Sequence, residues 1–144
     1  MNKVIAVCTS KEKGVRKQVV PEVQLKENFG VLGDAHADSQ THRQVSLLAV
    51  ESIAKMKKHG LNLSPGDFAE NITTEGINLV SIPVGTKVAV GDKVVLEISQ
   101  IGKECHTGCA IKKQVGKCIM PVEGVFGRVV KGGPVKAGDE IKII

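Results

Sequence analysis

Apolar residues occur in short runs along this chain, separated by glycine, proline and charged residues. Val4–Thr9 alternates weakly and is followed by the polar segment Ser10–Gly14, which predicts a strand and then a turn. Lys17–Leu25 is also predicted to be extended, and Pro21 within it favours a sheet edge or a break. The chain therefore begins with two extended segments.

One segment has the periodicity of a helix. Between Ala49 and His59, the apolar residues Val50, Ile53 and Ala54 recur at the i, i+3, i+4 spacing that places side chains on one helix face. Lysines load the last turn and Gly60 stands at the stop position, both of which favour a helix end there. The sequence predicts one main helix around 49–59.

Short strands and turns are predicted on both sides of this helix. Gly91-Asp92-Lys93 lies between two apolar runs, Lys87–Val90 and Val94–Ser99, and predicts a hairpin. The other predicted strands are Arg43–Leu48, Ala69–Thr74, Gly124–Lys131, which Gly132–Pro134 closes as a turn, and Glu140–Ile144. Roughly six to eight short strands with one helix predict a mainly β fold, a compact closed β-barrel in a single domain over 1–144.

Composition agrees with a strand-rich core. The chain has 144 residues, enough for one domain to bury a core without disulfides or metal. It contains three Phe and no Trp or Tyr, so the core must be built from Val, Ile and Leu. These branched side chains favour strands.

Charge and hydropathy argue against several classes of protein. The N-terminal apolar run is shorter than the roughly 7–15 residues of a secretory signal or the roughly 20 of a membrane span, which predicts a soluble, cytoplasmic protein. The net charge of +5 is mild and its bases are scattered, which argues against nucleic-acid binding and favours a pocket for a small anion. We find no acid/base dyad, Ser-His-Asp order or phosphate loop, which argues against a hydrolase or kinase.

The chemistry is concentrated in one segment, 100–118, which holds three of the four cysteines. It follows the predicted strand Val94–Ser99, and nearby cations favour the thiolate form of cysteine and lower its pKa. These cations are Lys103, His106, Lys112, Lys113 and Lys117, against the single acid Glu104. A reactive thiol, suited to accept sulfur or to act in redox chemistry, is therefore expected here.

Two other interpretations of these cysteines remain open. Cys105, His106, Cys109 and Cys118 are enough ligands for a tetrahedral zinc site, although adjacent residues in an extended backbone face opposite sides. A redox disulfide between Cys105 and Cys109 is the second, with a looser spacing than Cys-x-x-Cys. Cys118 and Cys8 are better explained as small buried hydrophobic residues.

Five motifs follow one another along nearly the whole chain: Gly33–Ala37 with Arg43–Leu48, Gly66–Ile72, the Gly91–Asp92 hairpin, Gln100–Cys105 and Gly124–Val129. In sequence and order they resemble the motifs of MOSC domains, named after the C-terminal domain of molybdenum cofactor sulfurase. The match is closest to the stand-alone bacterial form, which is associated with molybdenum cofactor biosynthesis proteins. The resemblance selects Cys105 over Cys109 as the hallmark cysteine.

The resemblance implies a β-barrel of the pyruvate-kinase type and a role in sulfur chemistry. The family is proposed to receive sulfur as a cysteine persulfide, here on Cys105, from a pyridoxal-phosphate-dependent cysteine desulfurase. The sulfur is then delivered to the molybdenum cofactor or to metal–sulfur centres. The alternative implied by other relatives is a module that binds the molybdenum cofactor, with Cys105 as a molybdenum ligand, in reduction of N-hydroxylated compounds.

The resemblance also implies a pocket that gathers polar residues around the cysteine. Four of these residues also have a plainer explanation. Arg43 would be a sheet-edge residue and Arg128 a solvent-facing charge, and Glu70 and Asn71 would be partners of loop backbone groups. Of the two loop histidines, His36 is preferred over His42 as the pocket residue. The predicted substrate- or anion-binding residues are His36, Arg43, Glu70, Asn71, Lys103, His106 and Arg128.

This chain departs from the one-cysteine pattern of many family members. Cys105 is followed closely by His106 and Cys109. Cys109 is therefore a candidate resolving thiol, and a metal held between the two cysteines stays open. Asp34 is expected to brace its loop.

Overall fold

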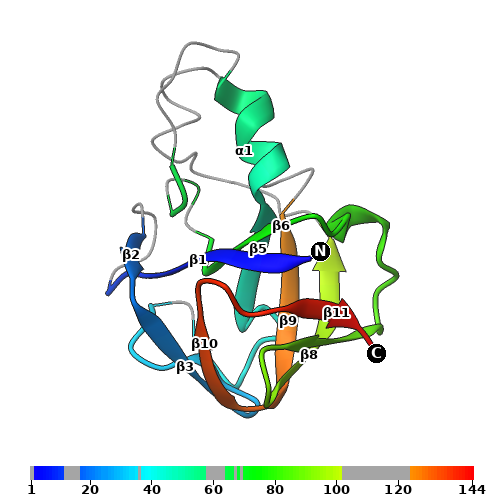
Figure 1. The fold of residues 1–144 in the computed structure, drawn as a ribbon. Coiled ribbons are helices and arrows are strands. Elements are labelled where there is room, and N and C mark those ends of the chain that lie inside the picture. Colours follow the sequence, from blue (N-terminus) through cyan, green and yellow to red (C-terminus); the bar gives the residue numbers. More distant parts are fainter. Residues whose placement is uncertain are drawn as a thin grey trace.

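The computed structural model describes residues 2–11, 17–35, 37–57, 64–66, 68, 70–101 and 124–144, with only the backbone at 55–57. Strands dominate this part of the chain, and the helix α1 (Val50–Lys57) stands at one end of them (Figure 1). A short 3-10 helix, η1 (Leu79–Ser81), follows later. No described helix is long and apolar enough to cross a membrane.

The strands form two sheets. The larger has eight strands, which in spatial order are β11 (Ile141–Ile143), β7 (Lys87–Val90), β8 (Val94–Ile101), β9 (Val125–Lys131), β5 (Val45–Ala49), β6 (Ile72–Glu75), β1 (Lys3–Thr9) and β2 (Gln18–Val20). The smaller has three, β10 (Gly133–Lys136), β3 (Glu22–Lys26) and β4 (Gly30–Val31). All named pairs are antiparallel except β5 and β6, which α1 connects.

The predicted closed barrel is wrong, because both sheets are open. The edge strands of the larger sheet, β2 and β11, do not pair with each other. The start of β1 meets the turn before β11 through backbone hydrogen bonds, from Val4 N to Asp139 O at 2.8 Å and from Gly138 N to Val4 O at 2.8 Å. These contacts include a single bridge, Lys3 with Glu140, and do not form a ladder. β11 has three residues, too few to continue pairing along β1.

Alternation along the strands creates the main core. In β8, Val94, Leu96 and Ile98 are buried in the main cluster, while the intervening side chains are partly exposed. Leu25 of β3 and Val135 of β10 contribute from the smaller sheet. The core is therefore aliphatic and enclosed by both sheets, as the shortage of aromatic residues predicts.

The opposite face of the larger sheet is also buried in part. Cys8 on β1, Leu48 on β5 and Phe126 on β9 are buried but lie outside the main core cluster. Buried polar side chains, including Ser46 and Thr73, accompany them. Because buried polar groups need hydrogen-bond partners, this second face depends on specific contacts.

Gln44 links the two sheets where the turn after β3 meets β9. Its side chain is fully buried, donates from Nε2 to Asn28 Oδ1 and to Thr41 O (both 3.1 Å), and accepts at Oε1 from Val129 N at 3.0 Å. Asn28 N also donates to Val129 O at 2.9 Å. The turn between β3 and β4 is thereby attached to β9.

Most predicted elements are confirmed within a few residues. The hairpin at Gly91–Lys93 joins β7 to β8, and the predicted helix is α1, described as far as Lys57. Pro21 lies at the break between β2 and β3, where the chain passes from one sheet to the other. The predicted turn Gly132–Pro134 is wrong in part, because β10 begins at Gly133. Pro134 is tolerated there since β10 is an edge strand.

We predict that Gly30→Ala destabilises the fold much more than Gly33→Ala. Both glycines have positive φ, +128° and +84°, so each substitution strains the backbone by about 1–3 kcal/mol. A Cβ at Gly30 would also clash with the backbone carbonyl of Gln44, whereas one at Gly33 has no atom within 4 Å. Urea unfolding measures both free energies. Equal losses for the two variants would contradict the close packing of Gly30 on Gln44.

Candidate functional site

The side chain of Arg43 is held at the end of β8. Cys105 follows shortly after this strand in the sequence. Arg43 Nε donates to Gln100 Oε1 at 2.9 Å, and the Arg43 guanidinium lies 5.8 Å from the centre of the Phe126 ring. Gln100 and Phe126 are register partners on β8 and β9. Arg43 is exposed, so two adjacent strands orient a permanent positive charge towards solvent at this point.

Arg128 lies on the same face of β9 as Phe126, two residues further along. It is exposed while Val129 is buried in the core, which agrees with the solvent-facing charge considered from the sequence. Glu97 on β8 is its register partner. Both line a pocket of about 290 Å³ with His42, Val84, Gly85, Ile98 and Ser99. Arg128 is therefore pocket-lining as well as solvent-facing.

His42 is the described histidine at this pocket. Ser99 Oγ donates to His42 O at 2.6 Å and lies 3.2 Å from Phe126 O, which fixes the backbone of His42 against β8 and β9. The His42 Nδ1 atom is buried without a hydrogen-bond partner. The sequence favours His36, which lies outside the described residues, so that preference stays a prediction. His42 directly precedes Arg43 in the sequence, and this position is the signal that points to His42.

Asn71 braces the fold. Its Oδ1 accepts from Ser46 N at 3.0 Å and from Ser46 Oγ at 3.2 Å, and its Nδ2 donates to Cys8 O at 3.2 Å. Its backbone pairs with the same two residues, from Asn71 N to Ser46 O and from Cys8 N to Asn71 O. Asn71 is 1 % exposed. Its side chain therefore ties β1, β5 and the start of β6 together, away from solvent.

Glu70 is a buried carboxyl group beside Asn71. Thr73 Oγ1 donates to its Oε2 at 2.8 Å, while Oε1 is buried with no hydrogen-bond partner. Burial raises the pKa of Glu70, and the nearby backbone of Gly66, the Thr73 hydroxyl and the backbone of Phe68 offset part of that rise. The charged form is therefore disfavoured, and Glu70 acts inside the fold, not on its surface.

Asp34 braces its loop, as the sequence predicts. Its Oδ1 accepts from Ser10 N at 3.0 Å and from Lys17 Nζ at 2.8 Å. Lys17, which sequence reasoning assigned only to a strand, is a buried cation at this point. Nothing in its sequence context distinguishes it from the exposed lysines.

The remaining predicted site residues, Cys105, Cys109, His36, Lys103 and His106, lie outside the described residues, as does Cys118. Cys8 is buried, so its predicted place in the interior is confirmed. Among the residues that the structure describes, no group of three His, Cys, Asp or Glu side chains could hold a metal ion. The zinc interpretation concerns the undescribed cysteines and stays a prediction.

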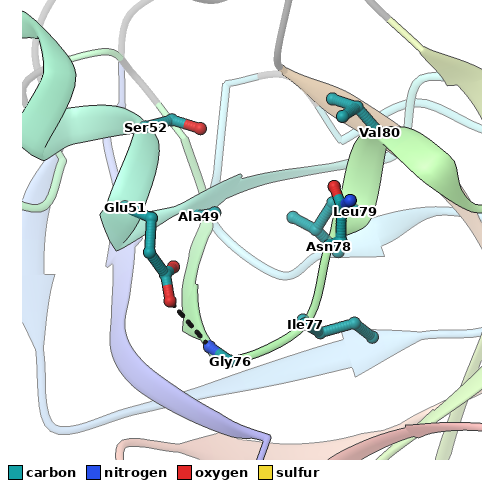
Figure 2. A pocket seen from close by; sticks show the side chains of 8 residues that line it. All are labelled: Ala49, Glu51, Ser52, Gly76, Ile77, Asn78, Leu79 and Val80. Carbon is teal, nitrogen blue, oxygen red and sulfur yellow. Dashed lines mark hydrogen bonds between the residues drawn. The ribbon is translucent and has the colours of Figure 1, made fainter.

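A larger pocket, of about 410 Å³, lies elsewhere, between the start of α1 and the segment after β6. Figure 2 shows its lining, where Glu51 Oε2 accepts a hydrogen bond from Gly76 N at 3.0 Å. The other lining residues are Ala49, Ser52, Ile77, Asn78, Leu79 and Val80. None of the predicted site residues that the structure describes lines this pocket. Size alone does not make it the functional site, and the chemistry favours the end of β8.

The family model for the MOSC domain matches residues 32–142 of this chain. The chain belongs to the MOSC domain family. The matched range covers the loop of Asp34, both arginines, Glu70, Asn71 and the cysteine-bearing segment. The resemblance inferred from the five sequence motifs is therefore confirmed.

Solved structures share the fold of this MOSC domain. The YuaD protein of Bacillus subtilis matches with a TM-score of 0.81 and 16% identity, over 99% of this chain and 96% of that one. YiiM of Geobacillus stearothermophilus matches with 0.76 and 18%, over 100% and 75% of the chains, and YiiM of Escherichia coli with 0.72 and 18%, over 100% and 70%. No curated protein matches the chain.

We predict that Glu70→Gln makes the stability of this MOSC domain less dependent on pH. The folded protein keeps the Glu70 proton where the unfolded chain has lost it. Its stability therefore falls as pH rises from the ordinary value near 4.5 through the raised pKa. Over that window the variant should gain up to about 1.4 kcal/mol per pH unit relative to wild type in urea unfolding.

Thr73→Val is the complementary variant. It removes the hydroxyl that donates to Oε2 and stabilises the charged form, so the pH dependence should extend to higher pH. If the free energies of unfolding of wild type and Glu70→Gln changed with pH in the same way, the raised pKa of Glu70 would be contradicted.

Proposed function

We propose that this MOSC domain is a sulfur carrier whose working group is the Cys105 thiol. It receives sulfur as a persulfide from a pyridoxal-phosphate-dependent cysteine desulfurase and delivers it to the molybdenum cofactor or to metal–sulfur centres. The observation that carries the proposal is Arg43, held against Gln100 at the end of β8 and exposed to solvent. Gln100–Cys105 is also the motif that most closely resembles the family's cysteine segment.

A cation here matters because thiolate, not thiol, attacks sulfur. Arginine stays protonated throughout the physiological range, so Arg43 supplies a constant positive charge beside the strand that leads to Cys105. The lysines of the segment, Lys103 among them, and His106 add to this potential in the sequence. The same charges suit a persulfide, whose terminal sulfur is also anionic when deprotonated.

Sulfur uptake is a thiol exchange that needs no oxidant. The Cys105 thiolate attacks the terminal sulfur of the desulfurase persulfide, and a new S–S bond forms on Cys105. The original S–S bond breaks, and its electron pair leaves with the desulfurase cysteine as thiolate. If the terminal sulfur carries a proton, that proton is transferred to Cys105 together with the sulfur atom.

Release of sulfur as sulfide requires two electrons, and Cys109 is the proposed source. The Cys109 thiolate attacks the Cys105 sulfur atom that bears the terminal sulfur, and hydrosulfide leaves with the electron pair of the broken bond. The product is a Cys105–Cys109 disulfide, which a dithiol reductant must reopen before the next cycle.

In the sulfur-carrier proposal the molybdenum cofactor is cargo, and the described residues suit its phosphate. Arg43 uses Nε on Gln100, and its other guanidinium nitrogens have no protein partner among the described residues. Arg128 lies on the same face, at the pocket with His42. Guanidinium groups bind phosphate through paired hydrogen bonds. The same arrangement supports the alternative use, in which bound cofactor supplies oxygen-transfer chemistry and Cys105 is its protein ligand.

The sulfur-carrier proposal predicts that the protein gains the mass of one sulfur atom on incubation with a desulfurase and cysteine. Intact-protein mass spectrometry under anaerobic conditions measures the gain, which dithiothreitol should reverse. Cys105→Ser should abolish it, because no thiolate remains to accept the sulfur. Cys8→Ala is the matched control and should keep it, since Cys8 is fully buried.

Retention of the added sulfur by Cys105→Ser would overturn the assignment to Cys105. Failure of wild type to gain sulfur, together with copurified molybdenum and pterin that Cys105→Ser loses, would favour the cofactor-binding alternative. A gain that persists in Cys109→Ser but gives way to a disulfide in wild type, where Cys109 is present, supports the resolving role of Cys109.

A further inference from the structure

A buried ion pair joins two segments near the end of β1. Lys17 Nζ lies 2.8 Å from Asp34 Oδ1, and both side chains are 0 % exposed. Lys17 Nζ also donates to Ser10 Oγ at 3.2 Å, and Ser10 N donates to Asp34 Oδ1 at 3.0 Å. The other ion pairs of the described residues are exposed and longer, 3.8 Å for Lys3–Glu75 and 3.9 Å for Lys142–Glu140.

The pair anchors a loop that is otherwise short of regular structure. Ala35 N donates to Ser10 O at 2.8 Å, Ala37 N to Asp34 O at 3.2 Å, and Asp38 N to Phe29 O at 2.9 Å. Residues on both sides of His36 in the sequence are therefore tied to the body of the fold. Lys17 itself is fixed by its backbone N–H, which donates to Gly66 O at 2.8 Å.

Stability alone is a poor reason for this arrangement. Removing two charges from water is costly, and buried ion pairs can often be replaced by apolar side chains of similar volume without loss of stability. The pair is built where three segments meet: the end of β1, the start of β2 and the loop of Asp34. Such a pair imposes one register on these segments, because an apolar contact tolerates sliding and a 2.8 Å charged hydrogen bond does not.

We propose that Lys17 and Asp34 are positioning residues that fix the described backbone on either side of His36. They are assigned no chemical step of their own and act through the loop. The consequence for sulfur transfer rests on the proposed function, but the positioning of the loop does not.

The test replaces the pair with apolar residues, Lys17→Met together with Asp34→Leu. This double variant should unfold at a temperature equal to or above that of wild type, whereas Lys17→Met alone should be less stable because it removes the Lys17 charge that faces the buried Asp34 carboxylate. The double variant Lys3→Met with Glu75→Gln removes an exposed ion pair as the matched control and should leave the unfolding temperature, the histidine spectrum and sulfur uptake unchanged.

Two readouts separate the loop from the sulfur chemistry. In NMR spectra of the imidazole Cε1–H groups, the His36 resonance of the folded double variant should move more than those of the other three histidines. The rate of persulfide uptake from the desulfurase should fall on the order of 10- to 100-fold, as expected when a binding group is displaced.

An unchanged His36 resonance with unchanged uptake in the folded double variant would overturn the positioning role. If wild type takes up no sulfur but the His36 resonance still moves, the proposed function fails and the positioning role stands. If the double variant does not fold, the His36 resonance is measured in Asp34→Asn instead. Asn keeps an acceptor for Ser10 N while removing the charge. It should shift the same resonance, and an unmoved resonance would equally overturn the proposal.

Discussion

The hydrogen bonds of Asn71 are the interaction on which the described architecture depends most. β5 and β6 are parallel neighbours, and β1 lies beyond β6, so the entry to β6 is a point where three strands must be held in register. Asn71 does this by accepting from Ser46 and donating to Cys8 while it is almost completely buried. Loss of either partner would leave a buried amide group unpaired, which costs more than the hydrogen bond contributes.

This junction has a functional consequence because of what it aligns. With β5 fixed against β6, Arg43 just before β5 reaches β8 and β9 on the other side, where Gln100 and Phe126 hold it. The charged site and the buried brace thus lie on opposite sides of β5: Arg43 precedes β5 and contacts β8 and β9, whereas Asn71 bonds Ser46 of β5 from the start of β6. Glu70 and the Lys17–Asp34 pair extend the buried polar layer on the side of β1.

Local signals in the sequence predicted the strands well. Gly91, Asp92 and Pro21 determine turns and breaks through their own backbone preferences. The local sequence was therefore sufficient to predict these turns. Closure of the barrel was wrong because it requires pairing between the two edge strands, which are far apart in sequence and only three residues long each. Gly132–Pro134 was misjudged because an edge strand tolerates the residues that mark a turn.

The candidate site was predictable to a lesser extent. The motifs that contain Arg43 and Arg128 were visible in the sequence, but the contact of Arg43 with β8 and β9 was not predicted. The sequence already offered Glu70 and Asn71 as partners of loop backbone groups. The burial of Lys17 was not predictable, because it depends on which segments cover that side chain. A lysine in an extended run has the same local pattern whether it faces solvent or an aspartate such as Asp34.

The central claim is that Cys105 is the reactive thiol of this MOSC domain, and its alkylation rate as a function of pH tests that most directly. Iodoacetamide labelling followed by peptide mass spectrometry reports each cysteine separately. We predict that Cys105 reacts first and that its rate reaches half its plateau below about pH 8.5, the value for a free thiol. A rate that reaches half its plateau only at or above that pH, or earlier labelling of Cys8, would contradict the claim.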